Sequence, residues 1–376
     1  MARKIFIFTF PFISDNLFNM KISMRTKLAL IFLALACFMG VMTSLIINSL
    51  ITNQIIYEAQ ERVKEHLNTA RHVYISKVRD IDRIIKYASI RHILKRVLKE
   101  GNIASVHEEL SGLMKEEGLD FLTLVNRKGV VVFRFHHPKS FNDHVMNDPF
   151  IQKALEKKSL SGTQVLSGDE LLKEGEALSK KAIIPSIPTA KEKTIRKVEE
   201  TSGLVLKSAH PIIDFNGEIL GVMTGGILLN RNYEIVDQIK NIVFKDAKYK
   251  GKEIGTATIF LGDLRISTNV MDKEGNRAIG TRAMKEVQEQ VLGQGKPWIH
   301  RAFVVDDWYI TAYEPIFDVQ DEIVGMLYVG MREAKYAMLK ERLILLFFLF
   351  SMSAMVVALA VSFLLSWRIQ KKSTES

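Results

Sequence analysis

The sequence contains an internal repeat of one short structural unit. The segment PIIDFNGEILG at 211–221 aligns with PIFDVQDEIVG at 315–325, at a constant offset of 104 residues. Pro, Ile, Asp, Glu, Ile and Gly are identical in the two copies, and Gly226 then matches Gly330 at the same offset. Each copy has the pattern of a strand, a tight turn and a second strand. Because a repeated unit indicates a duplicated fold, we expect two tandem copies of one α+β module with antiparallel sheets.

A second hairpin is predicted upstream of the repeated unit in each copy. In the first copy the strands are expected at 119–126 and 130–135, where runs of β-branched and aromatic residues flank the turn RKG. The second copy has the same pattern at 254–262 and 263–270. A polar, Lys- and Glu-rich stretch at 168–202 separates the halves of the first copy, and we interpret it as a long surface excursion.

Two long runs without charged residues bracket these modules. The first covers 28–51 and the second covers 343–367, which makes 24 and 25 residues respectively. A helix of this length spans about 36 Å, enough to cross a hydrocarbon layer of about 30 Å. We therefore predict two transmembrane helices.

The basic residues beside these runs predict the orientation. Lys and Arg cluster on the outer flanks, at Arg25, Lys27, Arg368, Lys371 and Lys372. Because cytoplasmic flanks are enriched in positive charge, the segments 1–27 and 368–376 are expected to be cytoplasmic tails. Residues 52–342 would then lie outside the cytoplasm, in a two-pass protein of a bacterial inner membrane.

The charge distribution argues against a nucleic-acid-binding protein. The chain has 52 Lys and Arg against 42 Asp and Glu, a net charge of +10. Between residues 52 and 342, however, the balance is 44 basic against 40 acidic residues, because most of the excess lies in the two short tails. A nucleic-acid surface would require a basic patch within a folded domain.

A long helix is predicted directly after the first uncharged run. There is no Gly or Pro from Thr52 to Glu100, and Gly101 is a suitable C-cap. Apolar side chains recur at steps of three and four, at Ile56, Val63, Leu67, Ala70, Tyr74, Ile81, Ile84 and Ala88. This stripe either packs on the helix's own domain or forms a coiled-coil seam between two copies, and its narrowness favours the seam and hence a homodimer.

Together these features resemble a double Cache (fused Cache-type tandem) sensor, the extracytoplasmic domain of bacterial transmembrane receptors such as sensor histidine kinases and methyl-accepting chemotaxis proteins. The most specific segment is 256–330, which ends in the repeat motif P-I-x-D-x-x-x-E-I-x-G. The resemblance covers about 50–335 and implies two PAS-like Cache modules, antiparallel sheets with flanking helices. They would comprise a membrane-distal module at 102–240 and a membrane-proximal module at 241–335. In that family the ligand is usually held in the distal module.

One cluster in the distal module is a candidate ligand site. The first hairpin ends in FRFHHP, where the spacing R-x-x-H-P of Arg134 and His137 resembles the ligand strand of citrate and dicarboxylate sensor kinases. A second basic residue in those sensors lies four positions before the repeat's proline, and Lys207 occupies that position here. Arg and His can bind a carboxylate through charge-assisted hydrogen bonds. We predict a site for a small organic anion formed by Arg134, His137 and Lys207, with His136 and Ser208 beside them.

The alternative interpretation is that these are ordinary strand and turn residues. Adjacent histidines without a third ligand do not make a metal site, and no metal or cofactor is expected. In the proximal module Thr311 replaces Lys207, so no comparable cationic site is predicted there. The aromatic residues Trp308, Tyr309 and Tyr313 are interpreted mainly as core, with a small apolar pocket as the weaker possibility.

The sequence does not contain a recognisable catalytic constellation. It lacks a phosphate-binding glycine loop, a nucleophile elbow, a zinc-protease motif and kinase motifs, and Cys37 is its single cysteine. We therefore predict a membrane-anchored sensor and not an enzyme. Because nine residues follow Trp367, the output is expected from a separate kinase or chemotaxis protein. The alternatives are a binding or scaffold protein that regulates such a partner, and the truncated input half of a sensor kinase.

Overall fold

A computed structural model describes most of the chain, and its described residues form two compact units. The described residues are 24–100, 104–187, 199–245, 247–249 and 251–374. One unit comprises the two ends of the chain, up to Tyr57 and from Tyr336 onward, and the other comprises Glu58–Lys335. Each unit is considered by itself below.

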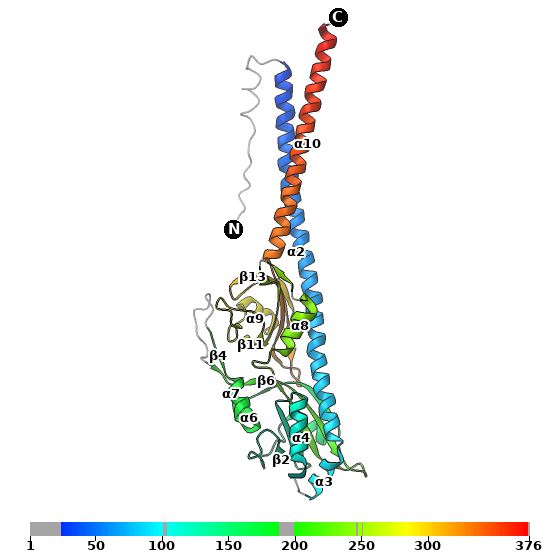
Figure 1. Cartoon of the computed structure of the whole chain (residues 1–376), viewed down its shortest axis with the longest axis vertical. Helices are drawn as coiled ribbons and strands as arrows, with labels where there is room; N and C mark the ends of the chain where they lie inside the picture. Colours follow the sequence, from blue (N-terminus) through cyan, green and yellow to red (C-terminus); the bar gives the residue numbers. More distant parts are fainter. Residues whose placement is uncertain (1–23, 101–103, 188–198, 246, 250, 375–376) are drawn as a thin grey trace. The chain divides into compact units, whose positions relative to one another are not determined.

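The unit of the chain ends is helical. Helix α2 (Met24–Ser89) begins in it, and helix α10 (Ala334–Thr374) ends in it (Figure 1). The uncharged runs 28–51 and 343–367 lie within these two helices. Among the described residues, no helix meets the length and hydropathy that a membrane span requires. The two-span arrangement therefore stays a prediction from the sequence.

The unit Glu58–Lys335 contains two five-stranded antiparallel sheets with equivalent strand orders. The first sheet has the order β2-β1-β7-β6-β3 and the second has the order β11-β10-β14-β13-β12. The first sheet consists of β1 (Phe121–Asn126), β2 (Val131–Arg134), β3 (Leu160–Leu166), β6 (Gly203–Ile213) and β7 (Ile219–Leu228). The second consists of β10 (Gly255–Leu261), β11 (Leu264–Thr268), β12 (Trp298–Val304), β13 (Asp307–Phe317) and β14 (Ile323–Arg332). The predicted α+β class with antiparallel sheets is confirmed.

The repeat corresponds to the same two strands in each sheet. Strands β6 and β13 begin at Gly203 and Asp307 and end at Ile213 and Phe317, so both ends keep the 104-residue offset. Strands β7 and β14 keep it as well. Each pair also carries an irregularity at the equivalent place, after Ile212 in one and Ile316 in the other. The repeat found in the sequence therefore corresponds to the last two strands of each sheet.

The identical residues of the repeat have local physical roles. Asp214 Oδ1 accepts hydrogen bonds from the backbone N–H groups of residues 216 and 218, at 2.8 and 3.0 Å, which closes the turn. Asp318 does the same in the second copy. A side-chain oxygen that bonds the following backbone in this way favours a tight turn. Gly221 allows close strand approach, because a Cβ there would lie 2.2 Å from the carbonyl oxygen of Val125.

Short helices and two small ribbons complete the unit. The helices of the first half are α3 (His92–Glu100), α4 (Ala104–Glu116), α5 (Pro149–Leu155), α6 (Gly168–Glu174) and α7 (Glu176–Ala182). Those of the second half are α8 (Glu234–Phe244) and α9 (Lys285–Val291). The ribbons pair β4 (Ile184–Pro185) with β5 (Glu199–Glu200) and β8 (Lys248–Tyr249) with β9 (Lys252–Glu253). The stretch predicted as a surface excursion therefore supplies α6 and α7, and its residues 188–198 lie outside the described part.

The helix predicted to run from 52 to 100 is interrupted. Helix α2 ends at Ser89, and α3 begins at His92. Ser89 Oγ donates a hydrogen bond to the carbonyl oxygen of Lys86 at 2.8 Å, a side-chain bond that competes with the helical backbone pattern. The break allows Leu94 and Val97 of α3 to be fully buried. The predicted single helix is wrong at this point, and the predicted cap Gly101 lies outside the described residues.

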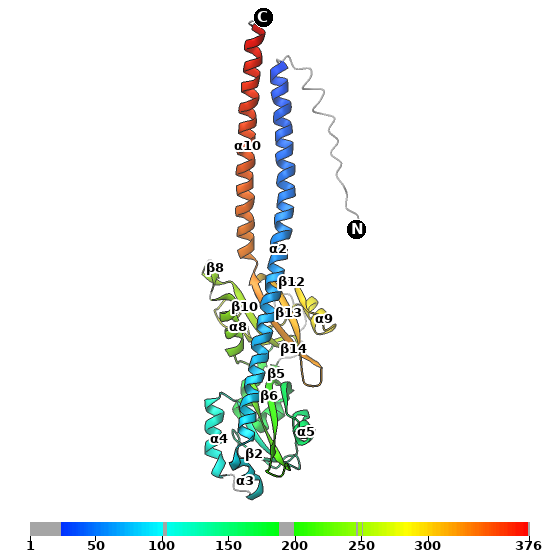
Figure 2. The ribbon, with the colours of Figure 1, turned by 90° about the vertical axis from the view of Figure 1, so that its right-hand side faces the viewer.

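The apolar stripe of this helix packs within its own chain. Its members Val63, Leu67, Ala70 and Tyr74 are all at most 8% exposed. In Figure 2 the lower part of α2 runs along both sheets. The hydroxyl of Tyr74 hydrogen-bonds Thr163 of β3 at 2.8 Å, and Arg71 forms an ion pair with Glu314 of β13. The predicted dimer seam through these residues is therefore wrong, because the face that would form it is already buried.

Candidate ligand site in the first module

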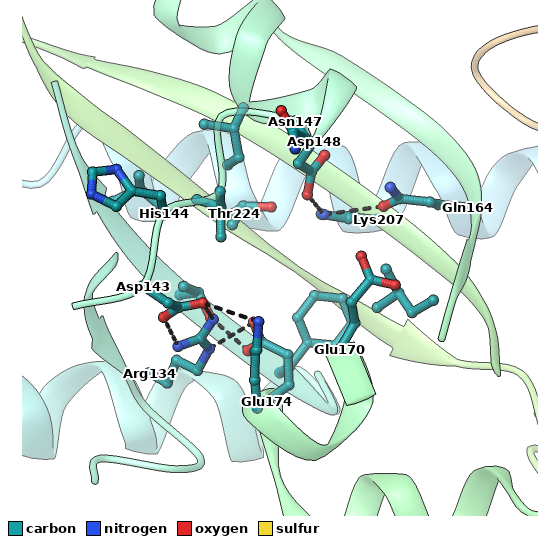
Figure 3. Close-up of a pocket in the computed structure, with 17 residues that line it drawn as sticks. Arg134, Asp143, His144, Asn147, Asp148, Gln164, Glu170, Glu174, Lys207 and Thr224 are labelled. Atoms are coloured by element: carbon teal, nitrogen blue, oxygen red, sulfur yellow. Dashed lines mark hydrogen bonds and ion pairs between the residues drawn. The ribbon is translucent and has the colours of Figure 1, made fainter. Parts of the chain in front are cut away.

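A pocket of about 250 Å³ opens on the first sheet. Its floor is formed by β1, β2, β3, β6 and β7, and its walls by α5, α6 and the segment 143–148. Figure 3 shows the polar side chains that point into it from these elements. The pocket thus combines parts of the sheet with parts of the chain between the two hairpins.

Arg134 forms one side of the pocket and is only 2% exposed. Its Nη1 and Nη2 donate to the two carboxylate oxygens of Asp143 at 2.6 and 2.9 Å, and Nε donates to Glu174 at 3.0 Å. Burial lowers the pKa of Arg134, but the bonds to Asp143 and Glu174 outweigh it and leave the pKa raised. The same bonds lower the pKa of Asp143. Arg134 is therefore a charged group that is already held by two carboxylates.

Glu174 reaches Arg134 because α6 begins at a defined position. Ser167 is the N-cap of α6, and its side chain and that of Glu170 each bond the other's backbone N–H, which makes a capping box. At the other end of the helix, Glu174 also accepts a hydrogen bond from Thr123 of β1 at 2.7 Å. Glu170 and Glu174 both line the pocket.

Lys207 forms the opposite side of the pocket and is 5% exposed. Its Nζ forms an ion pair with Asp148 and donates to Gln164 Oε1 at 3.1 Å. Asp148 has a second role as the N-cap of α5, where it accepts a hydrogen bond from the N–H of Phe150 at 2.9 Å. Pro149 at the first helical position favours the same start of α5. The helix start therefore fixes the carboxylate that pairs with Lys207.

The charges that line the pocket are nearly balanced. Three side chains are cationic, and four are carboxylates. The cations are Arg134, Lys173 and Lys207, and the carboxylates are Asp143, Asp148, Glu170 and Glu174. Such a site does not attract dianions through net charge. An ammonium has three donors, and the described residues accept two hydrogen bonds from Lys207, whose Nζ also lies over the Phe150 ring at 5.0 Å from its centroid.

The structure brings together two of the predicted site residues. Arg134 and Lys207 line the same pocket, and their role in ligand binding stays a prediction. Both histidines lie elsewhere. His136 is exposed, and its ring lies against Gly175. His137 Nδ1 lies 3.1 Å from the carbonyl oxygen of Lys173 and is not part of the pocket lining. Ser208 is fully buried and donates to Asp82 of α2 at 2.9 Å, away from the pocket.

The aromatic residues predicted in the second module separate into two groups. Tyr309 and Tyr313 are 1% exposed and belong to a core cluster that also contains Tyr328. Trp308 stacks edge-on against Phe303, with the Arg301 guanidinium 3.9 Å from its ring centroid. Thr311, at the position equivalent to Lys207, donates to the carbonyl oxygen of His300.

Sequence reasoning missed the acidic half of the pocket. Asp143, Asp148 and Glu174 are surrounded by other polar residues in the sequence, and nothing in their spacing sets them apart. Only Asp148 had a usable signal, since Asp before Pro indicates a helix start. Within the described residues, no group of three or more His, Cys, Asp or Glu is arranged to hold a metal ion.

The comparisons identify the second module. Residues 227–342 match the family model described as single Cache domain 3. A search of curated proteins finds no match. Residues 227–342 are therefore similar to a Cache domain, as the resemblance predicted, and this range contains all five strands of the second sheet. The match begins near the end of β7, so it leaves most of the first module unassigned.

Several solved structures are similar at low identity. The periplasmic domain of Vibrio cholerae LuxQ is 10% identical, with 72% of this chain and 99% of that chain covered and a TM-score of 0.40. The V. cholerae histidine kinase DctB sensor domain is 10% identical, with coverages of 73% and 96% and a TM-score of 0.41. The ligand-binding domain of the Campylobacter jejuni chemoreceptor Tlp3 in complex with L-valine is 11% identical, with coverages of 77% and 97% and a TM-score of 0.39.

Proposed function

We propose that the chain is a membrane-anchored extracytoplasmic sensor with two Cache modules, and that the first module binds a small organic acid. The observation that carries the proposal is the pocket that places buried Arg134 and Lys207 on opposite sides of one cavity. A buried ammonium that lines a pocket is suited to a ligand carboxylate. The proposal includes no catalytic role for the chain.

The assignment of a second Cache module rests on the duplication. The first sheet has the same strand order as the sheet of the matched domain, and its last two strands keep the 104-residue offset. The shared Asp turn and the shared strand irregularity support a common origin of the two halves. The first module would be the membrane-distal one.

The membrane anchor rests on the sequence. The uncharged runs 28–51 and 343–367 support two spans, and their basic outer flanks support cytoplasmic ends. An alkaline phosphatase fused after Lys250 should then be active in a bacterial host, and one fused after Ser376 should be inactive. The reverse pattern would rule out the orientation. A separate kinase or chemotaxis protein as partner is part of this proposal.

The balance of charges in the pocket narrows the ligand class. The predicted clamp of Arg134, His137 and Lys207 is revised, because Arg134 is already held by two carboxylates and His137 lies outside the lining. We expect the ligand carboxylate at Lys207. Glu170 and Glu174 would accept bonds from a donor on the same ligand, such as a hydroxyl or an ammonium group. Hydroxy acids and amino acids fit this description better than simple dicarboxylates.

A signal could pass from this pocket to α2 over a short path. Lys207 and Ser208 are neighbours on β6, and Ser208 donates to Asp82 of α2. His210 of the same strand lies 2.8 Å from the same carboxylate oxygen. A ligand that draws Lys207 away from Asp148 would therefore act on the strand that α2 contacts.

A thermal-shift screen on the purified full chain tests the ligand proposal. We expect hydroxy acids or amino acids to raise the melting temperature of wild type and to have much less effect on Lys207→Met. Lys153→Met is the matched control, since Lys153 is half exposed on α5 and forms an ion pair with the similarly exposed Glu156. If all effective compounds are neutral or purely cationic, the assigned ligand class is wrong.

A further inference from the structure

The second module contains a buried arginine without a carboxylate partner. Arg265 of β11 is 2% exposed. In the described part of the chain its guanidinium makes one hydrogen bond, from Nη1 to Thr281 Oγ1 at 2.5 Å, and forms no ion pair. Its Nε is buried and has no hydrogen-bond partner. Most of the donor capacity of this guanidinium is therefore unused.

This situation differs from that of the cations in the first module. Arg134 and Lys207 are similarly buried, but each is paired with at least one carboxylate. A buried charge that lacks both partner and water is strongly unfavourable. Burial accordingly lowers the pKa of Arg265, although an arginine stays charged in proteins. A bound anion would stabilise a buried cation of this kind.

The surroundings of Arg265 do not supply that anion. The guanidinium carbon lies 5.2 Å from the centroid of the Phe260 ring. Tyr309, Tyr313 and Tyr328 interact with it, and burial raises the pKa of all three phenols, that of Tyr309 to about 12. The three hydroxyls are therefore neutral at physiological pH. The result is an aromatic environment around one uncompensated positive charge.

A second unpaired donor belongs to the same face of the sheet. Trp298 pairs with Tyr313 across β12 and β13, and Tyr313 pairs with Tyr328 across β13 and β14. Directly paired residues point to the same side of a sheet. The Trp298 indole packs against the core cluster that contains both tyrosines, and its Nε1 is buried without a partner. Trp298 lies on β12, at the opposite edge of the sheet from β11, so this donor is separate from Arg265.

We propose that the second module binds a small monocarboxylate at Arg265, with the carboxylate on the unused guanidinium donors and a short apolar part among the aromatic rings. This site would be separate from the pocket at Lys207. The backbone of Arg265 bonds the segment that covers it, at Thr281 and Gly280, each at 2.9 Å. We therefore expect slow entry of the ligand, and samples need long equilibration.

Acetate is the probe, and the melting temperature of the purified full chain is the readout. Ionic strength is kept constant with a bulky sulfonate. At 100 times its Kd, acetate should raise the melting temperature of wild type by roughly 3–5 °C. Arg265→Gln should abolish this shift and, without acetate, should melt at or above the wild-type temperature. Arg301→Gln is the matched control, because Arg301 is half exposed and pairs with Glu333.

Two measurements on the Lys207→Met variant test the proposal further. Lys207→Met removes the anchor of the pocket in the first module, so an acetate shift that remains in this variant arises outside that pocket. Equilibrium dialysis of Lys207→Met with labelled acetate should give one bound acetate per chain, a result that does not require Arg265→Gln to fold. An equal shift in Arg265→Gln and wild type, or no bound acetate in Lys207→Met, would overturn the proposal. A shift lost only in Lys207→Met would overturn it too and would assign acetate to the pocket in the first module.

Discussion

Arg134 donates hydrogen bonds to both carboxylate oxygens of Asp143, at 2.6 and 2.9 Å, and this bidentate pair closes one side of the pocket in the first module. Glu174 holds the same guanidinium from α6 at 3.0 Å. Strand β2, helix α6 and the segment before α5 therefore all meet at Arg134. Its main role is to hold these parts of the pocket together, and it has little capacity left to bind a ligand. This role predicts a large effect on stability.

Replacement of Arg134 by Met should destabilise the chain strongly. It would leave Asp143 and Glu174 in a partly buried site without their cation, and breaking a buried pair costs about 3–5 kcal/mol. Urea denaturation measures the free energy of unfolding. Arg83→Met is the control, because Arg83 is exposed and its pair with Asp80 should contribute less than about 1 kcal/mol. Equal small losses for both variants would contradict the organising role.

The same ion pair predicts a dependence of stability on pH. Hydrogen bonds from Arg134 lower the pKa of Asp143, so the folded state holds this carboxylate in its charged form. The stabilisation is therefore complete above the unfolded pKa of about 4 and is lost as pH falls through the lower folded pKa. The difference in unfolding free energy between wild type and Asp143→Asn should shrink from pH 6 to pH 3. A constant difference over this range would be inconsistent with the pair.

Among the acidic residues of α2, Asp82 should be the one whose replacement by alanine lowers the free energy of unfolding most. Its Oδ1 accepts a hydrogen bond from Ser208 Oγ at 2.9 Å and lies 2.8 Å from His210 Nε2. Asp82→Ala would leave the fully buried Ser208 hydroxyl without this acceptor, at a cost of about 1–3 kcal/mol. Asp80→Ala, two residues away with an exposed Arg83 as partner, is the control. Chemical denaturation should show a clearly larger loss of unfolding free energy in Asp82→Ala than in Asp80→Ala.

Thiol labelling tests whether the stripe of α2 packs inside its own module. In a Cys37→Ser background, a cysteine at Leu67, which is 2% exposed, should react with maleimide only on unfolding. A cysteine at Lys64, whose side chain is 52% exposed, should react at once. Rapid labelling at both positions would mean that the stripe is free for another partner.

The repeat allowed much of the fold to be predicted, because its identical residues act locally. The turn aspartates Asp214 and Asp318 bond their own following backbone, so a short alignment sufficed to place β6, β7, β13 and β14. The apolar stripe of α2 was recognised too, but periodicity alone does not tell a sheet from a second helix as the partner. The burial of Val63 and Leu67 against the modules is a tertiary outcome.

The site was predictable only in part for a related reason. Arg134 and Lys207 were found through their spacing from a hairpin and from the repeat. Their partners Glu174 and Asp148 come from helices inserted between the hairpins, and the contacts depend on where those helices begin. Arg265 was missed altogether, since an Nε left without a hydrogen-bond partner in the described part of the chain leaves no signal in the sequence.

Calorimetric titration of the full chain with the best acid from the screen tests the central claim most directly. Lys207 is expected to donate a charge-assisted hydrogen bond to the ligand carboxylate, worth about 1.5–3 kcal/mol. Lys207→Met should therefore weaken binding roughly ten- to a hundredfold, whereas Lys153→Met should bind like wild type. Wild-type affinity in Lys207→Met would contradict the account of the pocket in the first module.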